Sequence, residues 1–536
     1  MTTHLFSLPS ELLIQIICLL PRSDIYAFQL TNKFLCNIIR SSVDVQYHIA
    51  LTSSCSEDNL YSSLPISEKL SVLREREKAW SLIKPRFTKV INAPDHAWRY
   101  QLLAGVIFLG DFERNTVHFL RLPSDESDEP QWEKIMTVSS IVEFCPVVEY
   151  DLIAIMTTTP KTQEDGQIVY RIEIGLHQLS SGKPHPQARE HNISVMDSLS
   201  EKPVVYIRIV GENLAPIFSF DGEQEKNDQI FVFKWRSGEL KEKWLAEHGS
   251  SATCLFLSEN LLLIPNQHNN SLDIFRIPER PGSLPPTPIV VLDLPTLAVG
   301  YRYRYIFPRT KPDPFTSPAY FTFREDEGSN RLLSKRSFFP KEEETISVFQ
   351  LVVDHIWRRR TILTFVMQTR AILNLVEMHY AHDQRDPKES APVILPYAIW
   401  GPSATRWFSS SDYANTWVAS SWGQRYVQLK HNFDGNGVPI IVMDFNPRSV
   451  QDWQRRNGRG GNEEGNPHRK WCVSSLDVVE PFEIFAEDVH GGLPYVATAT
   501  ETLYTFHGLM MDDERILGVK DKFSGGIDSI EVLYLG

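Results

Sequence analysis

The feature that most constrains the fold is a change of hydrophobic period near Ile91. Before it, apolar residues recur at helical spacing. After it, short runs rich in β-branched and aromatic residues alternate with turn signals, as in "LAGVIFLGD", "DQIFVFKWRSG" and "QRYVQLK". Many short strands separated by turns predict an all-β architecture. We therefore expect a helical N-terminal part and one large β-rich domain over residues 91–536.

Some of these β-type runs repeat. Residues 174–183 align without a gap to residues 230–239, and each run ends on an apolar residue before a Ser-Gly turn. Repeats of about 40–50 residues with four strands each are typical of β-propeller blades, and longer loops lengthen them. We place equivalent strand-end positions at Leu122, Leu179, Trp235, Ile277, Leu351, Leu429 and Phe506. They predict a propeller of about seven blades, with a β-sandwich or stacked β-domains as the alternative.

The stretch LPSELLIQIICLLP, residues 8–21, predicts a helix with almost no polar side. On an ideal helix its apolar residues spread over roughly 260°, whereas an ordinary surface helix has a stripe of ~100°. The run is too short for a membrane span. It also lacks the basic start of a secretory signal, because no Lys or Arg precedes Arg22. We expect this helix to be covered by its own domain on one side and by a partner on the other.

Two further short helices are expected after Pro21, and Thr31 or Asn32 can cap the second of them. A unit of three helices this small buries too little surface to be comfortably stable alone. A partner protein that completes its core would resolve both observations.

The spacing of Leu8-Pro9, Glu11-Leu12-Leu13, Ile16-Ile17, Leu20, Asp24-Ile25 and Leu30 resembles the F-box pattern LPxELLxxILxxLxxxDLxxxxxV. The resemblance covers about residues 6–50. It implies docking onto the SKP adaptor of SCF ubiquitin ligases and, through the adaptor, onto a cullin. The residues that it implies for adaptor contacts, or for the shape of that surface, are Leu8, Pro9, Leu12, Leu13, Ile16, Ile17 and Leu20. The sequence departs from many F-boxes at residues 31–34, where Phe34 stands in place of a Trp.

Two more helices are expected at residues 41–51 and 67–80, with a polar loop between them. The second of these helices is charged and ends in Trp80. The order of F-box, first helix and charged helix is similar to that of a large fungal class of F-box proteins. The expected organisation is an F-box domain at 1–50, a helical linker at 51–90 and the propeller-like interaction domain at 91–536.

Charge and cysteine content limit the partners. Residues 91–536 carry 59 Asp and Glu against 44 Lys and Arg, which makes this domain a poor generic binder of nucleic acid. The six cysteines are scattered without a CxxC pair, so neither a zinc site nor a disulfide framework is predicted. We expect a cytoplasmic or nuclear protein with reduced thiols and no membrane partner.

No motif predicts catalytic residues, a cofactor or a metal. The stretches HYAH (379–382) and HNFDGNG (431–437) contain metal-ligating residue types but lack complete ligand sets. We therefore expect a non-enzymatic substrate receptor of an SCF-type ubiquitin ligase, whose β-domain binds an unknown protein target. The alternatives are an interaction scaffold without a role in ubiquitylation and a propeller enzyme with a helical appendage. Interface hot spots favour Trp and Arg, so Trp400, Arg406 and Trp407 in WGPSATRWF are the candidate target-binding residues.

Overall fold

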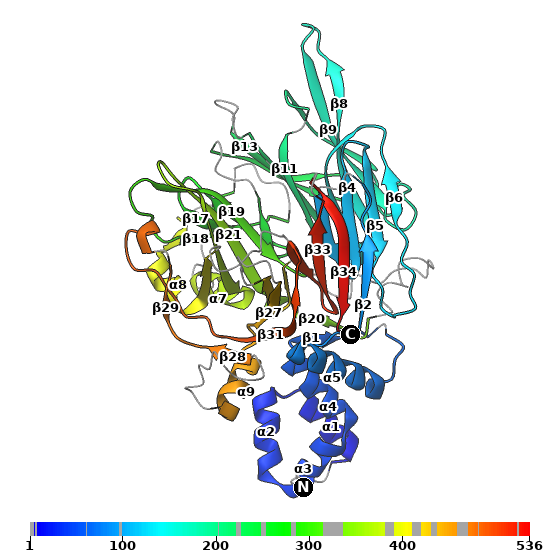
Figure 1. Ribbon diagram of the computed structural model, residues 1–536, viewed down its shortest axis with the longest axis vertical. Helices are drawn as coiled ribbons and strands as arrows, with labels where there is room; N and C mark the ends of the chain where they lie inside the picture. Colours follow the sequence, from blue (N-terminus) through cyan, green and yellow to red (C-terminus); the bar gives the residue numbers. More distant parts are fainter. Residues whose placement is uncertain are drawn as a thin grey trace.

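The first five helices of the described chain form one end of the molecule in the computed structural model (Figure 1). They are α1 (Ser10–Cys18), α2 (Arg22–Thr31), α3 (Lys33–Ser41), α4 (Val43–Ser53) and α5 (Ile66–Leu82). We call them the helical module. The structure describes residues 5, 8–60, 62–95, 99–201, 203–220, 227–247, 253–279, 286–314, 336–380, 391–409, 420–429, 437–457, 470–480, 482–522 and 525–536.

The helix boundaries follow from prolines and caps. Pro9, Pro21 and Pro65 directly precede α1, α2 and α5, because proline costs nothing where a helix has no hydrogen-bond partner for the first N–H groups. Of the two capping candidates for α3, Asn32 is the cap, and its side chain accepts a 2.7 Å hydrogen bond from the N–H of Phe34. The expected polar loop after α4 also contains a short strand, β1 (Ser56–Asp58).

Among the described residues after the helical module, seven sheets of four or five strands are arranged as a propeller, which confirms the predicted fold and blade number. The first three blades follow the chain without interruption: β3 (Arg99–Leu103), β4 (Val106–Asp111), β5 (Thr116–Arg121) and β6 (Glu133–Met136); β7 (Ser140–Val147), β8 (Leu152–Thr162), β9 (Ile168–Gln178) and β10 (Asn192–Ser198); β11 (Val204–Val210), β12 (Asn213–Ser219), β13 (Asp228–Lys234) and β14 (Leu240–Ala246).

Blades four to six contain insertions. Blade four contains β15 (Leu255–Ser258), β16 (Leu261–Asn266), β17 (Ser271–Arg276), β18 (Val290–Asp293) and the parallel β23 (Val393–Leu395). Blade five contains β19 (Tyr301–Thr310), β21 (Ile346–His355), β22 (Thr361–Gln368) and β24 (Thr405–Ser409). Blade six contains β25 (Ser421–Trp422), β26 (Arg425–Leu429), β27 (Val438–Asp444), β31 (Tyr495–Tyr504) and β28 (Lys470–Val473). The inserted elements are α7 (Thr369–Tyr380), α8 (Tyr397–Ala404), α9 (Pro447–Asn457) and the pair β29 (Asp477–Val478) with β30 (His490–Gly491).

The ring is closed by a strand from the other end of the sequence. Blade seven contains β32 (Gly508–Met511), β33 (Arg515–Asp521) and β34 (Ile527–Tyr534), and its fourth strand is β2 (Phe87–Asn92). The two strands pair in antiparallel register from Phe87 opposite Tyr534 to Asn92 opposite Ser529. The expected boundary at residue 90 therefore falls inside β2.

One backbone hydrogen bond recurs in all seven blades and defines the repeat. The N–H that follows the third strand donates to the carbonyl just before the second strand, at 2.6–3.0 Å. The donors are Leu122, Leu179, Trp235, Ile277, Thr369, Phe445 and Leu535, and all of them are buried.

Four of the predicted strand-end positions are therefore correct. The other three are wrong: Leu351 and Leu429 lie on second strands, and Phe506 follows β31. The insertions in blades five and six lengthen the sequence interval between equivalent strand ends, so regular spacing does not predict these positions.

None of the helices within the described residues has the length and apolar character to cross a membrane. All six cysteines are free. Burial raises the pKa of the Cys55 and Cys145 thiols to about 11, which makes both poor nucleophiles.

Candidate functional site

The F-box core explains which residues of α1 face inward. Leu13 and Ile17 are each 1% exposed and pack with Ile25, Ile38 and Val45 from the next three helices. The i, i+4 spacing of Leu13 and Ile17 places both on one face of the helix. These two predicted adaptor residues therefore form the interior of the F-box.

A neighbouring side of α1 is an exposed apolar surface. Leu12, Ile16 and Leu19 are 45%, 36% and 85% exposed, and their spacing places them on one face. Pro9 is exposed as well. We call Pro9, Leu12, Ile16 and Leu19 the α1 face. Of the remaining predicted residues, Leu8 and Leu20 are partly buried against the F-box core.

The helical module is joined to the propeller by a buried tryptophan. Trp80 of α5 is 2% exposed and packs against Trp422, Val427 and Leu533 of blades six and seven. Its indole N–H donates a 3.0 Å hydrogen bond to the carbonyl of Asp513. Trp80 thus belongs to the propeller core although it lies on a helix of the preceding module.

Charged and backbone contacts reinforce this junction. The Arg425 guanidinium lies 2.5 Å from the Glu77 carboxylate and 5.0 Å from the Trp80 ring centre. Strand β1 pairs with β20 (Phe338–Pro340). The Asn446 side chain donates a 2.8 Å hydrogen bond to the carbonyl of Ser53. Several independent contacts therefore fix the orientation of the helical module on the propeller.

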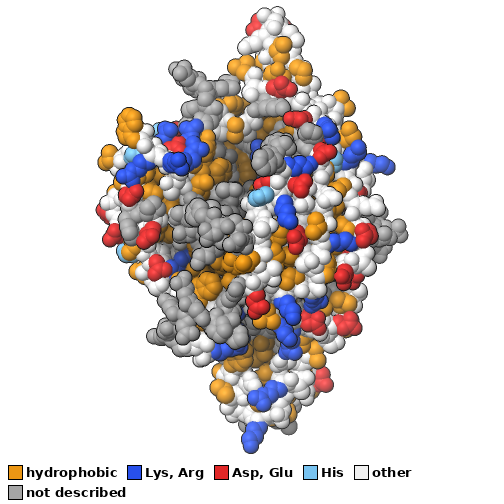
Figure 2. Space-filling model, in the orientation of Figure 1, with side chains coloured by type: hydrophobic (Ala, Val, Ile, Leu, Met, Phe, Trp, Pro, Cys, Tyr) orange, Lys and Arg blue, Asp and Glu red, His pale blue; other side chains and the backbone are white. Residues whose placement is uncertain are grey.

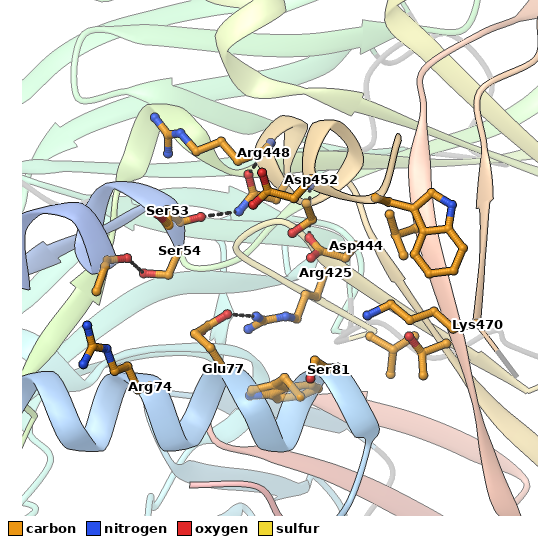
Figure 3. Close-up of a pocket in the computed structure, with 18 of the residues that line it drawn as sticks. Ser53, Ser54, Arg74, Glu77, Ser81, Arg425, Asp444, Arg448, Asp452 and Lys470 are labelled. Atoms are coloured by element: carbon orange, nitrogen blue, oxygen red, sulfur yellow. Dashed lines mark hydrogen bonds and ion pairs between the residues drawn. The ribbon is translucent and has the colours of Figure 1, made fainter. Parts of the chain in front are cut away.

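A cavity of about 430 Å³ lies between α5, the end of α4, blade six and α9 (Figure 3). We call it the junction cavity. In Figure 3, Arg74, Glu77 and Ser81 extend from α5, and Arg425 and Lys470 approach from the strands of blade six. Its walls are strongly charged, and it lies apart from the α1 face.

A second cavity, of about 450 Å³, is lined by the first strands of several blades and marks the propeller channel. Its charged wall residues within the described part of the chain are Arg99, Glu143, Arg208, Arg309 and Lys311. Asp313 accepts a hydrogen bond from the Lys311 ammonium at 2.6 Å and lies 3.7 Å from Arg208. Burial lowers the pKa of Lys311 and Arg309. The four cations of the described wall outnumber the two carboxylates, Glu143 in the wall and Asp313 beside it.

This local charge differs from that of the whole domain, which has an acidic excess. On the face shown in Figure 2, acidic and basic side chains are interspersed over the propeller rather than gathered into one patch. The acidic composition therefore does not describe the electrostatics of the channel.

The predicted target-binding residues lie in the interior of blade five and its neighbours. Trp400, Arg406 and Trp407 are 3%, 3% and 8% exposed. The Arg406 guanidinium donates to the Asp477 carboxylate at 2.6 Å and to the carbonyls of Leu493 and Ser475. A target contact by these three residues stays a prediction, and the structure gives each of them a packing role.

Sequence reasoning missed Leu19 and the channel cations. Leu19 could have been found from its i+3 spacing to Ile16. The channel residues carry no sequence signal, because they come from different blades. The HYAH and HNFDGNG stretches lie largely outside the described residues; within the described part of the chain, no group of three or more His, Cys, Asp and Glu is placed to hold a metal ion.

Comparison with known proteins identifies the N-terminal part. Residues 5–45 match the family described as F-box domain, so this chain is an F-box protein with a seven-bladed propeller after the F-box. The F-box indicates binding to an SKP-type adaptor of SCF complexes, and the propeller suggests a module for protein interaction. Comparison with curated proteins gave no match.

Similar solved structures include two propeller domains. The C-terminal WD40 domain of Sif2 is 8% identical, with a TM-score of 0.33, and the match covers 84% of this chain and 97% of that one. The propeller domain of Cps50 (Swd1) from Myceliophteria thermophila is 10% identical, with a TM-score of 0.35 and coverages of 84% and 98%. The assignment of the propeller rests on the sheet topology of this chain.

Proposed function

We propose that this protein is the substrate receptor of an SCF-type ubiquitin ligase. Its F-box would bind the SKP adaptor, and through it a cullin, in the cytoplasm or the nucleus. The observation that carries the proposal is the α1 face: three large apolar side chains lie exposed on a helix whose Leu13 and Ile17 already pack into the F-box core. Burial of one such side chain is worth about 1.5–3 kcal/mol, which favours a partner that covers all three.

The propeller is the target-binding part in this proposal. Binding residues concentrate where a rigid scaffold brings loops together, as around the channel of a propeller. The cationic channel favours a target segment that carries negative charge. Ubiquitin transfer would then be the chemistry of other subunits. We also propose the domain division F-box, helical linker and propeller, with β2 assigned to the propeller and the linker ending before Phe87.

Co-purification with a SKP adaptor tests the F-box half of the proposal. The double variant Leu12→Asp, Ile16→Asp should lose adaptor capture while it stays folded, because both side chains are exposed. Val138→Asp, at a fully exposed position on the propeller, is the matched control and should bind the adaptor normally. Normal capture by the double variant would contradict the proposal.

Target capture tests the other half. Proteins that co-purify with the wild type would be compared with those that co-purify with Arg99→Glu, which reverses an exposed charge of the channel. A target that is lost from this variant, while the adaptor is retained, would support the channel as the binding site. If every captured protein is retained by Arg99→Glu, the target binds elsewhere on the propeller.

A further inference from the structure

We propose that the junction cavity binds a small molecule carrying several phosphate groups, which fastens the helical module to the propeller. This site is separate from the α1 face and from the propeller channel, so the proposal does not rest on the function proposed above. A volume of about 430 Å³ lies within the usual range for small-ligand sites, about 300–1,000 Å³.

The wall of the junction cavity carries more cations than carboxylates. The carboxylates among its described residues are Glu77, Asp444 and Asp452. The cations are twice as many and come from α2, α5, α9 and two strands of blade six: Arg22, Arg74, Arg425, Arg448, Arg456 and Lys470. Positive charge therefore exceeds negative charge in this partly open cavity of a protein that is acidic overall.

Two of the three carboxylates already form ion pairs. Glu77 pairs with Arg425 at 2.5 Å and with Arg76 at 3.2 Å. Asp452 pairs with Arg22 at 3.4 Å and with Arg455 at 3.6 Å. These two carboxylates are thus neutralised by the guanidinium groups that they pair with. They do not compensate the other cations of the wall.

The third carboxylate, Asp444, is partly buried, and desolvation raises its pKa against the opposing effect of the Arg425 charge. It accepts a 3.0 Å hydrogen bond from the N–H of Asn446. No cation of the described residues lies within ion-pair distance of its oxygens. Asp444 therefore balances part of the positive charge of the wall, through its attraction to Arg425 and Lys470 beyond ion-pair distance.

Four cations of the cavity wall have no carboxylate partner among the described residues. Within the described residues, no carboxylate lies within 4 Å of Arg74, Arg448, Arg456 or Lys470. Arg74 donates to the amide oxygen of Gln46, and Arg448 donates to the sulfur of Cys55. Burial, together with the charges of Arg456 and Arg425, lowers the pKa of Lys470 against the opposing effect of Asp444.

The chemistry of this wall selects the ligand. Guanidinium groups bind phosphate through paired N–H···O bonds, and an ammonium binds it as a point charge. Four cations without a carboxylate partner, distributed over three elements, favour a ligand with more than one negative group. Trp453, which is partly exposed, also lines the cavity and offers an aromatic contact if the phosphates are attached to a ring.

The probe for the test is tripolyphosphate, titrated into the full-length chain by calorimetry at low salt. It should bind saturably, raise Tm and bind less tightly as salt is added, because ions screen the interaction. The double variant Lys470→Met, Arg456→Gln should weaken the affinity about tenfold or more. Lys470→Arg, which keeps the charge, should retain most of it.

The controls separate binding from folding. Arg359→Gln removes an exposed cation of the β21–β22 turn and should leave the affinity unchanged. Each variant without ligand should keep the Tm of the wild type within a few degrees and should still capture the adaptor. A nucleoside triphosphate is titrated in parallel to test whether a ring attached to the phosphates adds affinity. If it binds as tightly as tripolyphosphate, the site recognises the phosphates alone; if it binds more tightly, the tryptophan contact contributes. Absence of saturable binding, or equal binding by the double variant and the wild type, would overturn the proposal.

Discussion

Glu77 illustrates how much one residue contributes at the junction. Burial by itself would raise the pKa of this carboxyl, but Arg425 and Arg76 hold it below its ordinary value. A carboxyl whose pKa is lower in the folded than in the unfolded state stabilises the fold above its ordinary pKa. This stabilisation is lost as the pH falls through the lowered value.

We therefore expect acid to destabilise the wild type more than Glu77→Gln. At neutral pH the wild type should be more stable, and the difference between the two urea midpoints should shrink as the pH falls below the ordinary pKa of Glu. Glu68→Gln, at an exposed position of the same helix, should follow the wild type throughout. Parallel curves for Glu77→Gln and the wild type would show that the ion pair does not stabilise the junction.

Arg406 is the second residue that gives a sharp test. Its three hydrogen bonds tie β24 to the segments around Ser475 and Leu493. Arg406→Ala should lower the free energy of unfolding by roughly 2–3 kcal/mol, because buried carbonyls lose a charged donor.

Urea unfolding checks this expectation. Arg302→Ala is the control, because Arg302 is 69% exposed and pairs with Asp354 only at 3.8 Å; it should change stability by less than about 1 kcal/mol. If Arg406→Ala keeps full stability but loses target capture, Arg406 belongs to a binding surface after all.

At the scale of elements, β2 has the largest effect on the architecture. It is the edge strand of blade seven and lies between the helical module and blade one in the chain. Ile91 is its single fully buried residue and packs into the core formed by blades one and seven. Val90, its neighbour, is 61% exposed. The two positions therefore differ in burial within the same strand.

Ile91→Asp should destabilise the protein by about 2–5 kcal/mol, since it removes a buried apolar side chain and adds a charge. Val90→Asp introduces the same charge on the same strand and should cost much less. The two free energies of unfolding, measured in urea, check this difference. Equal effects of the two substitutions would mean that β2 does not close the ring as described.

At the scale of the whole molecule, the helical module and the propeller share structure instead of being joined by a loose linker. Trp80 packs in the core of blades six and seven. Both β1 and β2 lie in sheets with distant segments. In this arrangement the α1 face is held at a fixed distance from the propeller channel, and a bound target would have a defined position relative to the adaptor.

Calorimetry should therefore record a single unfolding transition for the full chain, because the two parts share a core. Trp80→Ala should lower Tm and separate the transition into two, since it removes the largest shared side chain. Trp422→Phe, within the same cluster, keeps an aromatic ring and should preserve one transition at a slightly lower Tm. Two separate transitions in the wild type would show that the module and the propeller are independent.

Local spacing in the sequence determined the helices of the F-box, the change to β structure and four of the seven blade positions. These features depend on residues close together in the chain: the apolar positions of residues 8–20, or the 56 residues that separate Leu179 from Trp235. In blades five and six the same reasoning failed, because α7, α8 and α9 are inserted between the strands of one sheet and interrupt the repeat.

Only the tertiary structure decided which side of α1 is covered, because Leu12 and Leu13 are equally apolar and the packing of α2, α3 and α4 selects Leu13. The same holds for contacts between residues far apart in the chain. Phe87 pairs with Tyr534, and Glu77 pairs with Arg425. No local pattern encodes such pairs: the closed ring brings their elements together, and the energy of each contact depends on burial that exists only in the folded chain.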